Sequence, residues 1–190
     1  MKLNYIFPTI IGEFNEPKLR DQLLPHVKRV LNNKKLLTYQ WGYKNTYGKS
    51  LQDLPEFDEF SKFLTRISSY YLNNLGYSCK EELKAEIFAS GMENGDLHGI
   101  HTHPGAELSG VFYLDCPEGS SDLMFHDPRN FRDYRATFNI EQSNDITSGI
   151  VRVKPKNGML LIWESWIRHE VLRNRSSSPR TTLVFNMTLL

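Results

Sequence analysis

The spacing of hydrophobic and polar positions changes near Lys84, and this change divides the chain into a helical part and a strand-rich part. Before Lys84, two stretches repeat apolar residues every three or four positions, which is typical of helices that bury one face. The first stretch begins after Asn15, a candidate N-cap followed by Pro17, and the second ends near Gly76. The apolar positions of the first stretch are Leu19, Leu23, Val27, Val30 and Leu31. Those of the second stretch are Phe57, Phe60, Phe63, Leu64, Ile67, Tyr70 and Tyr71. The pattern predicts two helices, the first kinked or shortened at Pro25.

Beyond Lys84 the period shortens toward two, and short apolar runs alternate with clusters of Gly, Pro, Asn, Asp and Ser. Such runs are typical of antiparallel strands in a sandwich or barrel. They cover residues 85–92, 108–114, 121–125, 150–153, 158–163 and 181–187. Because the helices come first and the strands follow, we expect an α+β protein, mainly β, whose helices cover one sheet of a β-sandwich.

Composition narrows the function classes further. The chain has 190 residues, of which 39% are hydrophobic and 24% charged, as in one packed globular domain. Its 23 basic and 22 acidic residues nearly cancel, so nothing in the overall charge indicates a nucleic-acid partner. Cys79 and Cys116 form no disulfide or metal pattern and indicate free buried thiols in a reducing compartment. With no secretion signal and no membrane-spanning stretch in the sequence, we expect a cytoplasmic protein without a membrane partner.

The histidines are unevenly distributed, because three of the six lie within residues 98–103. On a strand, residues i and i+2 share a face and lie about 6.5 Å apart, so His101 and His103 would reach the same ion. Pro104 cannot donate to a strand ladder and marks the end of the strand or an edge. The His-x-His pair therefore predicts two ligands of a metal site, and a third ligand has to come from elsewhere.

Four other histidines are candidates for the third ligand: His26, His98, His126 and His169. Of these, His169 follows the apolar run 158–163 and precedes a polar loop, which suits a ligand at the end of a strand. We therefore predict a metal site of His101, His103 and His169. A pairing of His98 with His101 in another local geometry stays open.

Several motifs in a fixed order carry a family resemblance. The sequence reads HTHP, SGVFYL, SDLMFHDPR, VKPKNGMLLIWESWIRHEV and PRTTLVFN between about residues 86 and 187. This order resembles the Fe(II)- and 2-oxoglutarate-dependent oxygenases of the double-stranded β-helix fold, and especially a bacterial and phage group related to prolyl hydroxylases. The resemblance implies one oxygenase domain over residues 1–190, with helical support at about 1–84 and a β core at about 85–190.

The resemblance also assigns roles to single residues. It implies His101 as the first iron ligand and His169 as the distal one. Most of the superfamily carries Asp where this chain has His103, so either His103 completes an all-histidine set or a water takes that position.

An anchor for the 2-oxoglutarate tail is implied at Arg180, which follows His169 by 11 residues as in the family. The planar guanidinium suits a carboxylate because it binds both oxygens and never loses its charge. Tyr113 resembles a second anchor that some prolyl hydroxylases use, although a buried core tyrosine is an alternative interpretation. By strand alternation, Asn186 shares the face of Arg180, and Ser109 shares the face of Tyr113, so both are further candidates for co-substrate binding.

The implied reaction is an oxidation by O₂ in which 2-oxoglutarate is decarboxylated to succinate and a substrate is hydroxylated. Two alternatives stay open: a three-histidine cupin-type dioxygenase that does not use 2-oxoglutarate, and a non-enzymatic metal-binding β-sandwich. We expect a small-molecule or peptide substrate, with specificity set by the loop 129–145. The sequence identifies neither the substrate nor the oligomeric state.

Overall fold

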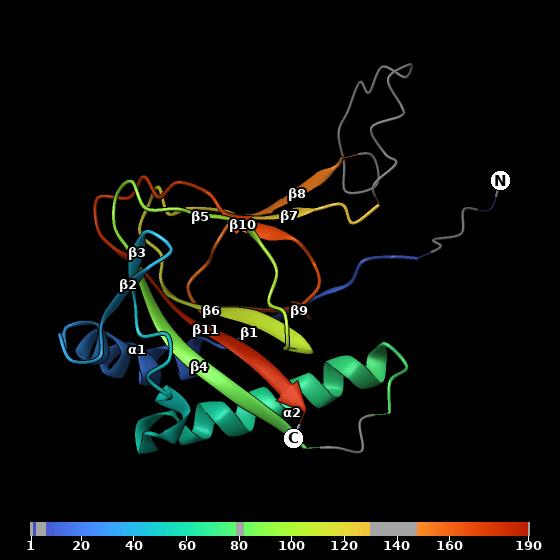
Figure 1. The fold of residues 1–190 in the computed structure, drawn as a ribbon, viewed down its shortest axis with the longest axis horizontal. Helices are drawn as coiled ribbons and strands as arrows, with labels where there is room; N and C mark the ends of the chain where they lie inside the picture. Colours follow the sequence, from blue (N-terminus) through green and yellow to red (C-terminus); the bar gives the residue numbers. More distant parts are fainter. Residues whose placement is uncertain (1, 3–6, 79–81, 130–147, 190) are drawn as a thin grey trace.

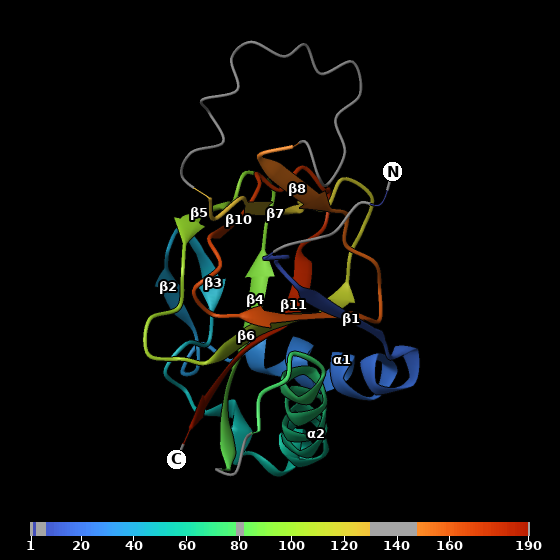
Figure 2. The same ribbon diagram turned by 90° about the vertical axis from the view of Figure 1, so that its right-hand side faces the viewer.

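The structure is a computed structural model, and it describes residues 2, 7–78, 82–129 and 148–189. Two antiparallel sheets face each other, and two helices cover the outer face of the larger sheet (Figures 1 and 2). The helices are α1 (Pro17–Leu31) and α2 (Asp58–Asn74). The strands are β1 (Ile11–Asn15), β2 (Thr38–Gln40), β3 (Tyr43–Asn45), β4 (Leu83–Met92), β5 (His98–His101), β6 (Leu108–Asp115), β7 (Leu123–His126), β8 (Ile150–Val153), β9 (Met159–Glu164), β10 (His169–Val171) and β11 (Arg180–Leu189). The predicted α+β class with a double-stranded β-helix is confirmed.

The larger sheet has the strand order β1-β9-β6-β11-β4-β3-β2. Its central strand β11 pairs with β4 from Arg180↔Met92 to Leu189↔Leu83 and with β6 on the other side. Alternate residues of β11 point to opposite faces. Leu183, Phe185 and Met187 pack in the core beneath the helices, whereas Val184 packs in the core between the two sheets. The face predicted to carry Arg180 and Asn186 is therefore the face that looks toward the smaller sheet.

The smaller sheet has the strand order β5-β10-β7-β8 and lies on the far side from the helices (Figure 1). Its strand β10 is short and central, and the pair His169↔His101 joins it to the edge strand β5. Strand β7 flanks β10 on its other side, where His169 is opposite Phe125. This register brings two histidines that are 68 positions apart in the sequence onto neighbouring strands.

Several details differ from the sequence-based expectations. The described residues before β4 form strands as well as helices: β1 pairs with β9, and the β2–β3 hairpin extends the larger sheet beside β4. Helix α1 runs through Pro25 from Pro17 to Leu31. Strand β5 ends at His101, so His103 lies in the following loop and not on the same strand. Three-residue strands have no periodicity to detect, which explains why β2 and β3 were missed.

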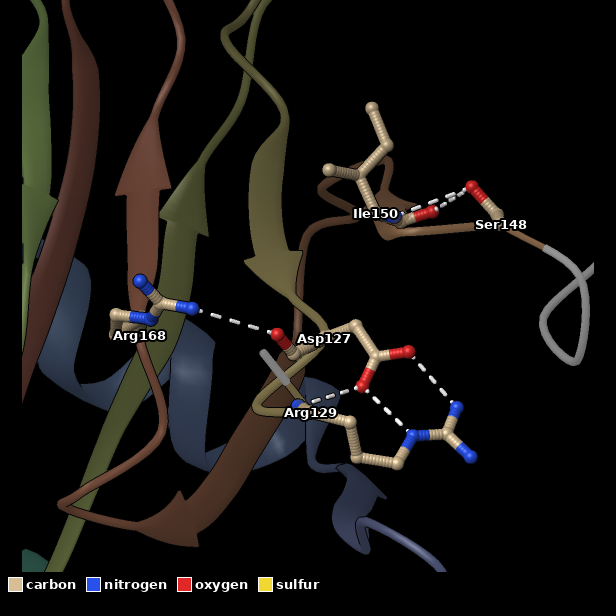
Figure 3. Close-up of polar contacts among 5 residues, drawn as sticks. All are labelled: Asp127, Arg129, Ser148, Ile150 and Arg168. Atoms are coloured by element: carbon tan, nitrogen blue, oxygen red, sulfur yellow. Dashed lines mark hydrogen bonds and ion pairs between the residues drawn. The ribbon is translucent and has the colours of Figure 1, made fainter. Parts of the chain in front are cut away.

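The Asp127-Pro128-Arg129 motif closes a turn after β7 (Figure 3). Arg129 donates two side-chain hydrogen bonds to the Asp127 carboxylate, at 2.9 and 2.8 Å, and its backbone N–H donates a third at 3.0 Å. Arg168, just before β10, reaches the Asp127 carbonyl oxygen at 3.5 Å. Of the loop expected to set specificity, residues 130–145 lie outside the described part of the chain, as does Cys79.

No helix in the part of the chain that the structure describes has the length and apolar character to cross a lipid bilayer. Cys116 is a free cysteine and is partly buried, whereas the sequence led us to expect a buried thiol.

Candidate metal centre and co-substrate pocket

Three histidines converge between the two sheets: His101 at the end of β5, His103 in the loop after it and His169 at the start of β10. One ring nitrogen from each lies within 4.8 Å of the others. The Nε2 atoms of His103 and His169 are 3.2 Å apart. These are the three histidines predicted from the sequence. Among the histidine, cysteine and acidic side chains of the described residues, they form the group that lies close enough together to hold one metal ion.

Hydrogen bonds fix the tautomers of these rings. The Nδ1 atom of His101 lies 2.7 Å from the Gly99 carbonyl oxygen, and that of His169 lies 2.8 Å from the Ile167 carbonyl oxygen. Because a carbonyl oxygen only accepts hydrogen bonds, each Nδ1 carries the proton and donates it. The Nε2 atom of each ring then keeps a free lone pair. Neutral imidazoles with one nitrogen held in this way are the usual metal ligands of proteins.

The protein environment keeps the rings uncharged. Burial, together with the neighbouring His101, lowers the pKa of His169 to about 3. Burial also lowers the pKa of His103 to about 4 and reduces that of His101. Since metal binding requires the unprotonated nitrogen, three rings that are neutral at pH 7 bind an ion without first losing protons.

The other candidate histidines are not part of this cluster. His98 stacks on His101 with ring centroids 3.8 Å apart, and its Nδ1 lies 3.3 Å from the Tyr43 hydroxyl. His26 is on α1, where Arg29 contacts its ring, and His126 lies 3.0 Å from the Glu170 carboxylate. His98 thus supports the orientation of His101 from the side, and the open alternative in which His98 is a ligand gains no support from the geometry.

A cavity of about 620 Å³ opens between the sheets and includes all three histidines of the triad in its wall. Strand β11 contributes every second residue to this wall, from Arg180 to Thr188. Trp163 lines it as well, with its ring 4.8 Å from that of His169. Most of the remaining wall is apolar or aromatic, including Trp41, Tyr43, Tyr47, Phe88, Met92, Val111 and Leu123. The cavity therefore offers a largely apolar surface around the histidine triad.

Arg180 is the cation in the wall of this cavity, and it is 2% exposed. Its Nη1 reaches only the Met92 sulfur, at 3.2 Å, while its Nε has no hydrogen-bond partner. Its guanidinium carbon lies 5.0 Å from the centre of the Tyr113 ring. None of the ion pairs in the described part of the chain involves Arg180. A buried charge without a counter-ion is costly, so an anionic ligand at this end of the cavity would be stabilised by Arg180.

The structure separates the four residues predicted to bind the co-substrate. Tyr113 lies beside Arg180 with its hydroxyl buried. Burial raises its pKa and the nearby Arg180 acts against that rise, so the phenol keeps its proton and can donate it to a ligand. Asn186 lies six residues along β11 from Arg180, about 20 Å at strand spacing. Its side chain and that of Ser109 contact the His103 end of the cavity instead.

Sequence reasoning missed Tyr43, which lines the cavity on the β2–β3 hairpin. Burial raises its pKa, and the Arg180 charge acts against that rise. Only the pairing of β3 with β4 brings this residue to the site, so no local sequence signal identifies it.

Fold and site together describe a double-stranded β-helix protein in which three histidines that could hold a metal ion share a cavity with a buried arginine. Residues 86–186, more than half of the chain, match the model of the family described as "Putative 2OG-Fe(II) oxygenase". The chain belongs to this family of oxidoreductases, whose cofactor is Fe(II) and whose co-substrate is 2-oxoglutarate. The resemblance inferred from the sequence motifs is confirmed.

Solved structures support the same fold. A Pseudomonas putida prolyl-4-hydroxylase superposes with a TM-score of 0.67 at 16% identity, covering 95% of this chain and 93% of that one. A Trichoplax adhaerens prolyl hydroxylase in complex with a hypoxia inducible factor peptide fragment gives 0.62 at 12% identity, covering 94% and 83%. The epimerase SnoN in complex with Fe³⁺, alpha ketoglutarate and nogalamycin RO gives 0.69 at 13% identity, covering 95% and 79%. No sequence among curated proteins matches the chain.

The residues present suit the family's two ligands. Three neutral imidazoles fit a divalent iron ion, and the unpaired guanidinium of Arg180 fits a carboxylate. The triad and Arg180 both lie in the wall of one cavity.

Proposed function

We propose that the chain is a 2-oxoglutarate-dependent hydroxylase acting on a peptide, an amino acid or a small metabolite, and that residues 1–190 work as one catalytic unit. The observation that carries the proposal is the buried, unpaired Arg180 in the same cavity as the histidine triad. A metal-binding module or a three-histidine dioxygenase without a keto-acid co-substrate has no need of this costly charge.

In this proposal, separate residues of the chain bind the metal and the co-substrate. His101, His103 and His169 hold the metal through their Nε2 atoms, and the acceptors at Nδ1 keep the rings in place. Arg180 binds the far carboxylate of 2-oxoglutarate through its guanidinium, and Tyr113 is the candidate for a further hydrogen bond to it. Bound iron supplies the activation of O₂ that couples oxidation of 2-oxoglutarate to oxidation of the substrate.

The aromatic side of the cavity is left for the substrate. Once Arg180 is occupied by the co-substrate, the remaining wall offers Trp41, Tyr47 and Ile100, and no other lysine or arginine among the described residues lines it. This wall favours an uncharged or apolar reacting group over an anionic one, because an anion buried there would have no partner.

Arg180→Ala is expected to weaken 2-oxoglutarate binding by about tenfold or more. The substitution removes hydrogen bonds to a charged group, each worth about 1.5–3 kcal/mol, and about 1.4 kcal/mol corresponds to one factor of ten. Arg180→Lys should restore only part of the affinity, because an ammonium group lacks the planar pair of donors. Anaerobic titration of the Fe(II) protein with 2-oxoglutarate measures this.

Arg175→Ala is the matched control, since Arg175 is exposed and lies just before β11, in the segment that leads to Arg180. It should bind 2-oxoglutarate as the wild type does. Thermal unfolding of each variant checks that the fold persists. Wild-type affinity in folded Arg180→Ala would mean that another group anchors the co-substrate. A wild-type protein that binds Fe(II) but no 2-oxoglutarate would favour the three-histidine dioxygenase.

A further inference from the structure

His103 depends on a chain of side-chain contacts that ends at Glu86 on β4. The Nδ1 atom of His103 lies 2.6 Å from the amide oxygen of Asn186. The amide nitrogen of Asn186 in turn donates to the Glu86 carboxylate at 3.1 Å. Asn186 and Glu86 are direct partners across the β11–β4 ladder, and Asn186 is 8% exposed, so the contact is sheltered from solvent.

The other neighbours of Asn186 do not fix which way its amide points. The Ser109 hydroxyl lies 3.1 Å from the amide oxygen and 2.7 Å from the Ser165 hydroxyl. A hydroxyl can donate or accept, so this pair adapts to either orientation. Glu86 cannot adapt, because a carboxylate only accepts. Turning the amide would place its oxygen against the carboxylate, about 3 Å away, and two acceptors at that distance repel.

We infer that Glu86 is a positioning residue for the metal centre: its carboxylate holds the Asn186 amide with the oxygen toward His103, which keeps the proton on Nδ1 and the Nε2 lone pair toward the metal. His101 and His169 need no such device, because backbone carbonyl oxygens hold them. Among the cavity-lining residues of the described chain, Glu86 is the one acid. The inference rests on the metal-binding half of the proposed function and is independent of 2-oxoglutarate.

Glu86→Gln tests this with a nearly isosteric change. A glutamine side chain accepts either orientation of Asn186, so the amide and the His103 tautomer become mixed. Co(II) and Zn(II) affinity, measured by titration, should fall about tenfold or more, since outer partners of metal ligands typically contribute 10- to 100-fold. In long-range ¹H–¹⁵N spectra of the metal-free protein, His103 should change from the Nδ1–H tautomer to a mixture.

Glu82→Gln is the matched control, because Glu82 is exposed, precedes the same strand and carries the same charge. It should leave both the metal affinity and the His103 tautomer unchanged. A Glu86→Gln protein that folds, keeps wild-type metal affinity and retains the Nδ1–H tautomer would overturn the inference.

The same Glu86→Gln change, made in a variant with a different side chain at position 103, distinguishes positioning of the Asn186 amide from a general effect of the Glu86 charge. In His103→Asp, the side chain at position 103 is an acceptor, so the Asn186 amide has to turn its nitrogen toward it, and Glu86 opposes that turn. Adding Glu86→Gln should therefore cost less metal affinity in this background than in wild type, or should increase it. An equal loss in both backgrounds would mean that Glu86 acts only through its charge. If wild type binds no metal, the proposed function fails, while the tautomer measurement still decides this inference.

Discussion

Replacing His169 with alanine is expected to abolish stoichiometric binding of a divalent metal, with a loss of affinity of about 100-fold or more. The His169 side chain is 3% exposed, and its Nε2 atom lies 3.2 Å from the Nε2 atom of His103, another member of the triad. Removing it leaves two imidazoles, fewer than the three protein ligands that open catalytic sites use. The loss should exceed the 10- to 100-fold that outer partners contribute. Metal content after equilibrium dialysis against Fe(II) or Co(II) measures it.

His26→Ala is the control for this variant, since His26 lies on α1 outside the triad. It should retain one metal ion per chain. His98→Ala distinguishes a stacking residue from a ligand: it should weaken binding without changing the stoichiometry. Full occupancy in folded His169→Ala would rule out the assigned site, and loss of the ion in His98→Ala would make His98 a ligand.

Gly110→Ala is expected to have the largest effect on stability, lowering the free energy of unfolding by about 3 kcal/mol or more. A Cβ atom at this position would lie 2.1 Å from Phe185 Cζ and 2.4 Å from the Leu161 carbonyl oxygen. Phe185 is fully buried and Leu161 presents backbone, so neither moves without shifting β11 or β9. Overpacking of a core typically costs about 1–3 kcal/mol, and here a backbone atom is involved as well. Chemical denaturation measures the change.

Gly91→Ala provides the matched control within the same sheet. Its added Cβ would meet only the end of the Leu31 side chain, at 3.4 Å, which is ordinary contact with a flexible group. We expect a change below about 1 kcal/mol, as for tolerated surface and packing changes. Equal stability of Gly110→Ala and wild type would contradict the close approach of β6, β9 and β11 on which the geometry of the cavity depends.

The alternation of residues along β11 is a feature of the site that the sequence predicted. A period of two in residues 181–187 predicted that Arg180 and Asn186 share a face, and that face lines the cavity. The spacing of His101 and His103 and the place of His169 after an apolar run led to the three histidines that the structure brings together. The prediction for β11 succeeds because it depends on local periodicity, which the backbone enforces directly. His103 reaches the cluster from the loop after β5, and not through the strand alternation that the sequence led us to expect.

The contacts of Asn186 are a feature of the site that the sequence could not predict. The sequence suggested a role for Asn186 at the co-substrate, but its partners are His103 and Glu86, the latter 100 positions away on β4. Tyr43 likewise reaches His98 only because the β2–β3 hairpin joins the larger sheet. Such pairs depend on the register between distant strands, and the hydrophobic pattern does not specify which polar residues become partners.

The most direct test of the account is anaerobic addition of 2-oxoglutarate to the Fe(II) protein while the visible spectrum is recorded. If the triad and Arg180 bind metal and co-substrate in one cavity, a weak charge-transfer band should appear and saturate with 2-oxoglutarate in wild type. The band should be absent in His169→Ala and should need about tenfold more 2-oxoglutarate in Arg180→Ala. Fe(II) bound stoichiometrically by the wild type with no band at any 2-oxoglutarate concentration would contradict it.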